Sequence, residues 1–364
     1  MSRIIWMLQV FALLSLVNPH AAQADSFVFV SLLQERKIVT FQRTVDSGEL
    51  RPTEVTECGA EPAYLTSSKD GRVLFASYRS SGQLAAFRID ASTGKLNLIN
   101  VVEGGEDPAF LLPDRTGRFL LTAYYVSNKV TVHRVDAEGR LSENPVCSLP
   151  TAANAHGVAI DSKNRSVYVS HTGANRIDQF GFDQETGILT PFDPPFVTAN
   201  AIQNPRHIVL HPSDRWAYCS NEAGGSIEDG ASLYARDPKT MRLTQEQAVL
   251  SLPETFDANQ NSTAECLLTP DGKFLYVANR GHNSIAGFSV NQSTGRLTRV
   301  SVTPTEAVPR SFTISPDGRH LYVAGEASGR VASYAIQASG ELYPRAVVDS
   351  GPISWAILAV DVKR

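Results

Sequence analysis

The feature of this sequence that most constrains its fold is a short unit that returns about every 46 residues. An apolar phrase beside a turn marks each copy, and its central residues are Phe29, Phe75, Leu121, Tyr168, Tyr218, Tyr276 and Tyr322. Repeats of this length made of short strands are typical of β-propellers, in which each repeat forms one blade. Because equivalent positions superpose around one axis, a polar residue that departs from the repeat has a predictable place in space.

Each repeat contains signals for four antiparallel strands. In one copy, residues 309–314 alternate in polarity and end at the turn Ser315-Pro316-Asp317-Gly318, which reverses the chain into a second strand at 321–324. Turns rich in glycine and serine then lead to a third strand at 331–336 and to a fourth. The opening phrase of the first strand occurs seven times, at Pro62, Pro108, Ala155, Pro205, Ala264, Pro309 and Pro352.

The two ends of the chain supply complementary parts of one blade. The first copy of the second-strand phrase lies at residues 27–31, whereas the last opening phrase, at 351–360, has no second strand after it. We therefore expect the C-terminal strand to pair with the N-terminal strands and close the ring, which leaves no open edge. The prediction is an all-β, seven-bladed propeller that occupies residues 25–364 as a single domain and is a monomer.

Residues 1–24 read as a secretory signal peptide. Arg3 precedes an apolar run at 4–17, and Ala22-Gln23-Ala24 supplies a cleavage pattern. The alternative is a membrane anchor, but the apolar run is short for a transmembrane helix. We expect cleavage after Ala24, a periplasmic or secreted protein, and no membrane contact after cleavage.

Composition excludes some functions and leaves others open. The net charge is −4 and there is no basic tract, so we expect no nucleic-acid partner. The four cysteines, at positions 58, 147, 219 and 266, show no CxxC pair and no zinc-site spacing. Export permits a disulfide between Cys219 and Cys266, and buried free thiols are the alternative.

Two rings of equivalent positions should lie near the axis on one face of the disc, because the first strand leaves this face and the second returns to it. At the start of the first strand, the ring reads Ala63, Ala109, His156, Arg206, Glu265, Arg310 and Ile353. At the end of the second strand, it reads Leu33, Arg79, Tyr125, Thr172, Glu222, Arg280 and Glu326.

Ionisable residues in the two rings converge on one sector of this face. The spacing between repeats stretches to 58 residues between Tyr218 and Tyr276, partly at 227–231 and mainly at 251–263, which places a long loop beside the sector. Long insertions of this kind are often functional. Arginines at a narrow axial mouth suit an anion, since the guanidinium forms a fixed fork for a carboxylate or phosphate. The alternative is a polar rim whose charges pair across blades.

The other histidines are weaker candidates. His207 follows Arg206, so strand alternation predicts that it points away from the axis. His171 and His282 lie on the same rim, and we expect three further histidines to be exposed in turns or outer strands, namely His133, His211 and His320.

Several stretches resemble the lactonase family of seven-bladed propellers, which includes bacterial 6-phosphogluconolactonases and the fungal carboxy-cis,cis-muconate cyclase. The resemblance covers essentially all of the chain after residue 24. The most specific stretches are residues 204–212 (NPRHIVLHP), 217–222 (AYCSNE) and 269–280 (TPDGKFLYVANR).

The resemblance implies a set of site residues. A histidine, two arginines and a glutamate form the family's proposed active site, and by motif these fall on His156, Arg206, Arg280 and Glu222. The expected substrate-binding residues beside them are Arg310, Glu265, Asn221 and Asn279.

The activity expected from these residues is hydrolysis or formation of a lactone of an acidic small molecule, such as a sugar acid, without a cofactor. His156 would act as general base, the arginines would hold the developing negative charge, and Glu222 would either orient His156 or exchange the proton itself. Calcium-dependent lactonase propellers also exist. Here the two rings hold more arginines than carboxylates, which disfavours a bound cation. The other functional class is a non-catalytic periplasmic propeller that binds an anionic ligand or a protein partner.

Overall fold

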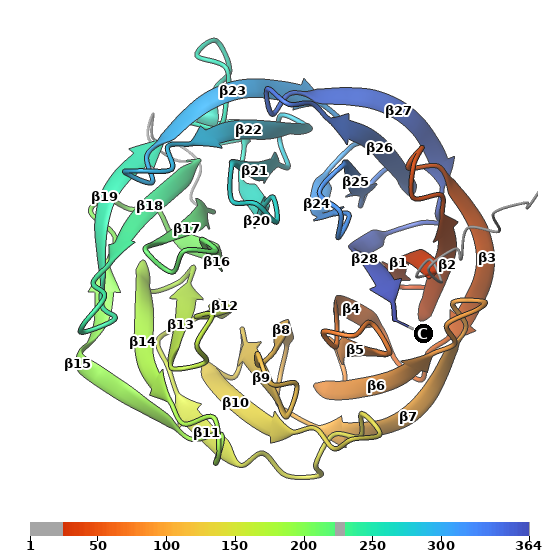
Figure 1. Cartoon of the computed structure of the whole chain (residues 1–364), viewed down its shortest axis with the longest axis horizontal. Coiled ribbons are helices and arrows are strands. Elements are labelled where there is room, and N and C mark those ends of the chain that lie inside the picture. The colour runs from red at the N-terminus through yellow and green to blue at the C-terminus, as the bar shows by residue number, and fades with distance from the viewer. Residues whose placement is uncertain (1–24, 223–229, 364) are drawn as a thin grey trace, which may run out of the picture.

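The computed structural model describes residues 25–222 and 230–363, which form seven four-stranded antiparallel sheets around a central axis (Figure 1). The predicted seven-bladed propeller is therefore confirmed. The residues predicted to form a signal peptide, 1–24, lie outside the described residues. Within the described ranges, no helix has the length and apolar character needed to cross a membrane.

Six blades are built from consecutive strands, with the first strand of each nearest the axis (Figure 1). Their strands are β4 (Pro62–Ser67), β5 (Val73–Tyr78), β6 (Gln83–Ile89) and β7 (Leu96–Glu103); β8 (Pro108–Pro113), β9 (Phe119–Tyr124), β10 (Lys129–Arg134) and β11 (Cys147–Pro150); β12 (Ala155–Ile160), β13 (Ser166–His171), β14 (Arg176–Phe182) and β15 (Leu189–Thr198); β16 (Pro205–Leu210), β17 (Trp216–Asn221), β18 (Ala231–Arg236) and β19 (Leu243–Val249); β20 (Thr263–Leu268), β21 (Phe274–Asn279), β22 (Ser284–Val290) and β23 (Leu297–Pro304); and β24 (Pro309–Ile314), β25 (His320–Gly325), β26 (Arg330–Ile336) and β27 (Leu342–Asp349).

The seventh blade joins the two ends of the described chain. Its strands, from the axis outward, are β28 (Ser354–Val362), β1 (Asp25–Leu32), β2 (Lys37–Arg43) and β3 (Leu50–Glu57). β28 pairs with β1 from Asp25 opposite Val362 to Leu32 opposite Ser354. The predicted ring closure is thus confirmed.

Tyrosines at the repeat marks link neighbouring blades. The hydroxyl of Tyr218 donates to the carbonyl of Gly295, at 2.8 Å, in the β22–β23 turn of the next blade. Tyr276 and Tyr322 make the equivalent bonds to Gly340 and Gly48, at 2.8 and 3.0 Å. A buried tyrosine ring contributes on the order of 2 kcal/mol through apolar burial, and its hydroxyl still needs a partner. These three tyrosines therefore hold their blades against the next ones.

The accepting turn requires glycine at its tightest point. Gly295 has φ +74°, and a Cβ there would lie 2.5 Å from the Trp216 ring of the preceding blade. Any other residue would strain the turn and separate the two blades.

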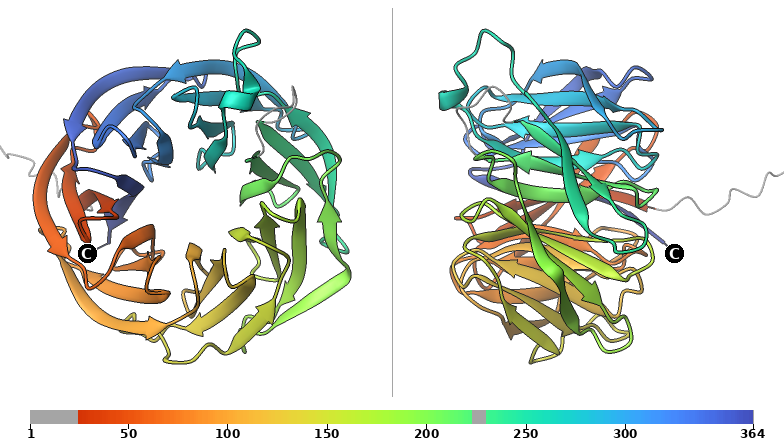
Figure 2. Two further views of the ribbon diagram at one scale, coloured as in Figure 1. Left: turned by 180° about the vertical axis from the view of Figure 1, so that it is seen from behind. Right: turned by 90° about the vertical axis from the view of Figure 1, so that its left-hand side faces the viewer.

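The two faces of the disc differ. One carries the starts of the innermost strands and the loop between β19 and β20, which contains the short 3₁₀ helix η1 (Ala258–Gln260). This loop projects from the disc on the side away from the C-terminus (Figure 2). Asn261 Oδ1 accepts the N–H groups of Gly281 and His282 at 3.0 and 3.2 Å, so the loop lies on the turn that follows Arg280. The predicted long loop therefore borders the charged sector.

The cysteines are free thiols. Cys219 and Cys266 are both buried in neighbouring blades, and no disulfide joins them. Burial raises the pKa of the Cys266 thiol to about 12. The predicted alternatives were a Cys219–Cys266 disulfide and buried free thiols, and the structure shows buried free thiols.

Candidate functional site

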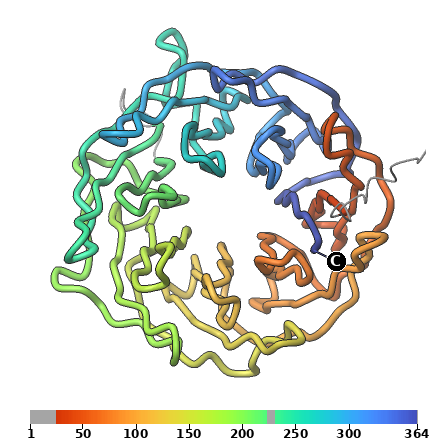
Figure 3. Tube along the Cα trace, in the orientation of Figure 1, coloured from red at the N-terminus to blue at the C-terminus, as the bar shows by residue number. Residues whose placement is uncertain are grey.

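A β-bulge at the start of each innermost strand shapes the axial site, and Figure 3 shows these inner segments surrounding the axis. In β16, Pro205 pairs with Asn221 and Ile208 pairs with Cys219, so that Arg206 and His207 together face one residue of β17. The same register shift occurs in the six other blades. As a result, two successive side chains of an inner strand line the axial pocket, where ordinary alternation would allow one.

The register of the pairing corrects the first predicted ring in two blades. Thr263 pairs with Asn279 as Pro205 pairs with Asn221, so Ala264 is the equivalent of Arg206 and Glu265 is the equivalent of His207.

In the closing blade, the N–H of Leu33 donates to the carbonyl of Ile353, as the N–H of Glu222 donates to that of Asn204. Ile353 therefore precedes the ring, and Trp355 is the residue that stands in it. Proline marks the first residue of the inner strand in four other blades, and it does not do so in these two. The corrected ring reads Ala63, Ala109, His156, Arg206, Ala264, Arg310 and Trp355.

Three of the four predicted catalytic residues form one ion-pair cluster. Glu222 Oε1 accepts a hydrogen bond from Arg280 Nη2 at 2.6 Å and lies 3.5 Å from Arg206 Nε. The Arg206 side chain is 2% exposed and that of Arg280 is 16% exposed, so both charges are largely removed from water. Burial, and then Arg280, lower the pKa of Arg206 to about 10, which leaves it cationic at neutral pH.

The positive charge of the arginines also determines the ionisation of the Glu222 carboxylate. Burial raises the pKa of Glu222, but Arg206 and Arg280 outweigh burial and hold the pKa below its usual value. Glu222 is therefore an ionised counterion in the free protein.

His156 lies at the same mouth but makes no ion pair. It is the second residue of β12, is 6% exposed, and its ring centroid is 5.1 Å from that of His207 and 5.8 Å from that of Tyr125. Its buried Nδ1 has no hydrogen-bond partner among the described residues. Burial, and then Arg206, His207 and Arg310, hold the pKa of His156 well below 6.5. The imidazole is therefore neutral at neutral pH.

A second pair of arginines completes the mouth. Arg310, expected to bind substrate, stacks over the Trp355 ring at 3.7 Å and lies 3.6 Å from Glu326. Arg79 lies 5.2 Å from the same ring and 2.7 Å from Asp107. Burial, and then Arg206 and Arg280, lower the pKa of Arg310 to about 9. Trp355 was missed because the closing blade was aligned on Pro352.

His207 also belongs to the site, and the prediction that it points away from the axis is wrong. The bulge interrupts the alternation of β16, so the His207 ring lies beside His156 and lines the pocket. Its Nδ1 is 2.5 Å from Glu265 Oε1 and its Nε2 is 3.1 Å from Arg206 Nη1. The expected exposure of three other histidines is also wrong: His133, His211 and His320 are all buried, because their strand and turn positions pack between blades.

The two predicted asparagines are not among the residues that line the pocket. Asn221 Nδ2 donates to Ser232 of β18, and Asn279 Oδ1 accepts from Ser251 and Asn261 of the long loop. Both side chains are fully buried at the ends of their strands. They hold the loop and the outer strand in place beside Glu222 and Arg280.

The pocket beneath the arginines is small. Its volume is about 20 Å³, and its walls include His156, Arg206 and Arg310. The Tyr64 and Phe110 rings stack at 4.3 Å and, with His207, separate it from a wider axial cavity of about 740 Å³ that opens on the other face. Such a volume holds about one water molecule, so a substrate must sit above the arginines and insert a single small group.

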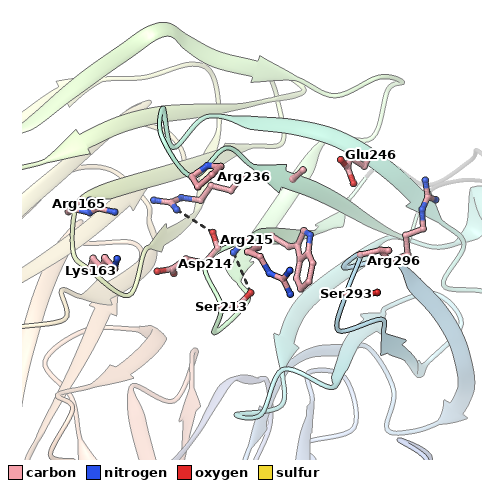
Figure 4. A pocket seen from close by; sticks show the side chains of 13 residues that line it. Lys163, Arg165, Ser213, Asp214, Arg215, Arg236, Glu246, Ser293 and Arg296 are labelled. Atoms are coloured by element: carbon pink, nitrogen blue, oxygen red, sulfur yellow. Dashed lines mark hydrogen bonds between the residues drawn. The ribbon is translucent and has the colours of Figure 1, made fainter.

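Another cavity, of about 670 Å³, lies away from the axis between the turns of three blades (Figure 4). It is lined by several cations, but Arg236 is 3.1 Å from Asp161 and Arg215 stacks over Trp216 at 4.1 Å. The residues of the predicted active site do not contribute to it. Across residues 25–222 and 230–363, no three side chains of His, Cys, Asp or Glu are grouped to hold a metal ion.

Comparison with known proteins agrees with this architecture. A family model described as "Lactonase, 7-bladed beta-propeller" matches residues 28–352. A 6-phosphogluconolactonase of Pectobacterium carotovorum (strain PC1) is 30% identical over 228 residues, which cover 62% of this chain and 67% of that protein. One from Serratia proteamaculans (strain 568) is 30% identical over 59% of this chain and 64% of that protein, so the match spans about two thirds of these relatives.

The structure of a periplasmic gluconolactonase from Pseudomonas aeruginosa superposes with a TM-score of 0.84. The two sequences are 24% identical, and the superposition covers 93% of this chain and all of the other. The similarity is one of fold.

Proposed function

Because this chain belongs to the lactonase family of seven-bladed β-propellers, we propose that it hydrolyses the lactone of an acidic small molecule at the axial mouth. The observation that carries the proposal is the convergence of His156, Arg206, Glu222 and Arg280 on one mouth above a pocket that admits a single small group.

The proposed reaction places the lactone ring above the arginines and inserts its carbonyl group between them. Its oxygen points toward Arg206, whose guanidinium stabilises the negative charge that grows as water attacks the carbonyl carbon. His156 accepts the proton of that water through Nε2 and returns it to the ring oxygen as the C–O bond breaks. The products are a hydroxy acid and an unchanged enzyme.

The charge of the substrate assists the base. In the free protein, burial and then arginine charge hold down the pKa of His156. An anionic group that binds among these arginines opposes their field, so it raises the pKa of His156 when the substrate is in place. Glu222 either orients the attacking water or leaves its arginines to the substrate anion.

The test is base consumption in a pH-stat with a panel of sugar-acid lactones. We expect His156→Ala and Arg206→Ala each to lower kcat/KM by about 100-fold or more. Thermal unfolding of each variant controls for misfolding. Turnover near the wild-type rate in both correctly folded variants would remove the mechanism.

One observation favours the alternative of a non-catalytic anion-binding protein. Both candidate bases are weak in the free protein: burial and then the arginines lower the pKa of His156, and the arginines outweigh burial to lower that of Glu222. An anion that raises the melting temperature, with no lactone of the panel turned over, would support binding without catalysis.

We further propose that the reaction needs no metal, because the mouth carries four arginines and its carboxylates are engaged by them. The proposal that the protein acts in the periplasm or outside the cell rests on the pattern of residues 3–24 alone. Cell fractionation with and without those residues tests it.

A further inference from the structure

A buried carboxylate–imidazole pair lies beneath the site and has no part in the proposed reaction. Glu265 of β20 and His207 of β16 occupy equivalent bulge positions in neighbouring blades, and each residue is 3% exposed. The distance from Glu265 Oε1 to His207 Nδ1 is 2.5 Å. Buried ionisable groups are costly unless they are bonded, so such a pair needs a reason.

The contacts of His207 fix the position of its proton. Arginine has only N–H donors, so Arg206 Nη1 must donate to His207 Nε2 across their 3.1 Å contact. The proton therefore resides on Nδ1 and is donated to Glu265. Burial lowers the pKa of His207, with Glu265 opposing, which leaves a neutral imidazole between a carboxylate and a guanidinium.

Further bonds hold the pair from the other side. Ser311 Oγ donates to Glu265 Oε2 at 3.3 Å, and the N–H of Ile357 donates to Ser311 Oγ at 3.3 Å. The chain of bonds thus crosses four consecutive blades, from β16 to β28. The Phe110 ring meets the His207 ring edge-on at 5.1 Å and shields it. In such a dry setting, hydrogen bonds are stronger than in water.

We propose that Glu265 and His207 are positioning residues that hold Arg206 in advance for an anion. Through the imidazole, the negative charge of Glu265 acts on one side of the guanidinium. The hydrogen bond from Nη1 to His207 Nε2 fixes the position of Nη1. The Nε edge, which has no hydrogen-bond acceptor among the described residues, is then left on the Glu222 side of the mouth. Fixing a long side chain before binding spares the entropy that a free arginine would lose. The part that this plays in lactone hydrolysis rests on the proposed function, whereas the anion binding does not.

The first test measures the affinity for inorganic phosphate by calorimetry at about pH 7.5. We expect His207→Phe and Glu265→Ala each to raise the dissociation constant about tenfold, and Glu265→Gln, which keeps an acceptor for Nδ1–H, to raise it about threefold or less. His133→Phe is the matched control, because His133 is fully buried and its ring nitrogens have no partner among the described residues. The control should bind phosphate as the wild type does.

A double-mutant cycle separates positioning from general damage to the fold. In an Arg206→Ala background, His207→Phe should weaken phosphate binding no further, because there is no guanidinium left to position. An equal loss in both backgrounds would overturn the proposal, as would wild-type affinity in His207→Phe. Failure of the wild type to bind phosphate would also overturn it.

Nitrogen-15 spectra of the histidine rings provide a test that needs neither turnover nor a ligand. We expect His207 as the Nδ1–H tautomer in the wild type and in Glu265→Gln, and a change of tautomer or exchange between tautomers in Glu265→Ala. An Nε2–H tautomer in the wild type would overturn the proposal even if one variant failed to fold. If phosphate and tautomer behave as expected but no lactone is hydrolysed, the proposed function fails and the positioning role stands.

Discussion

Glu222 lies between the two guanidiniums that would hold the proposed anionic ligand. Glu222→Gln should therefore make the free protein less stable and make the anion bind more tightly. At an effective dielectric constant of about 20, its contacts of 2.6 Å to Arg280 and 3.5 Å to Arg206 correspond to about 6 and about 5 kcal/mol of attraction. Desolvation offsets most of this, and the side chain of Glu222 is 26% exposed. We expect the free energy of unfolding to fall by about 2 to 3 kcal/mol.

The assay is thermal unfolding across a phosphate series, with calorimetry at one temperature. For a domain of this size, the expected loss corresponds to a melting temperature lower by about 3 to 4 °C. Phosphate should restore it and bind about tenfold more tightly than in the wild type, because both guanidiniums are then free.

Glu326→Gln is the matched control for this variant. Its side chain is equally exposed, at 26%, and it makes a single contact of 3.6 Å, to Arg310. Glu326→Gln should lower the free energy of unfolding by about 1 kcal/mol or less. A Glu222→Gln protein with the melting temperature and phosphate affinity of the wild type would refute the idea that this carboxylate competes with the ligand.

Three further outcomes follow from the charges of the structure. The acid limb of kcat/KM should lie below about pH 6.5, since burial and the arginines lower the pKa of His156; a midpoint above that value would contradict this. Burial lowers the pKa values of His133 and His171 to about 4, below the unfolded value of about 6.5. Below about pH 6.5, the unfolded chain therefore binds more protons than the folded chain. The stability that these two histidines contribute is present above that pH and is lost as the pH falls. Between about pH 7 and 5, the free energy of unfolding of His133→Phe should fall by about 2 kcal/mol less than that of the wild type, as measured by chemical unfolding. Dialysis against EDTA should leave lactone turnover unchanged; a loss that calcium restores would indicate a metal site.

The sequence predicted the blade count, the ring closure and the second ring of positions, because the strand-two phrase has the same length in every copy. It misaligned two blades because it placed their strand starts at Ala264 and Pro352, whereas the strands begin at Thr263 and Ser354, neither of which is a proline. It also missed His207, because alternation fails at a bulge. A signal for that bulge was present: Asn204, directly before the strand, has φ +52°, a conformation that asparagine tolerates and that leads into the bulge.

The arrangement of charge explains how this mouth could favour anionic substrates. Each arginine contacts a carboxylate from a neighbouring segment of the rim, as Arg79 contacts Asp107 and Arg310 contacts Glu326. Arg206 and Arg280 share Glu222, so these contacts leave the mouth with an excess of positive charge before a ligand arrives. A neutral lactone that enters leaves this excess in place, and His156 then keeps its lowered pKa and remains a weak base. An anionic lactone adds negative charge beside the same arginines and strengthens the base at the moment that the carbonyl reaches Arg206. On this reasoning, the discrimination between the two substrates should lie in kcat as well as in KM, because the bound anion alters the proton transfer itself.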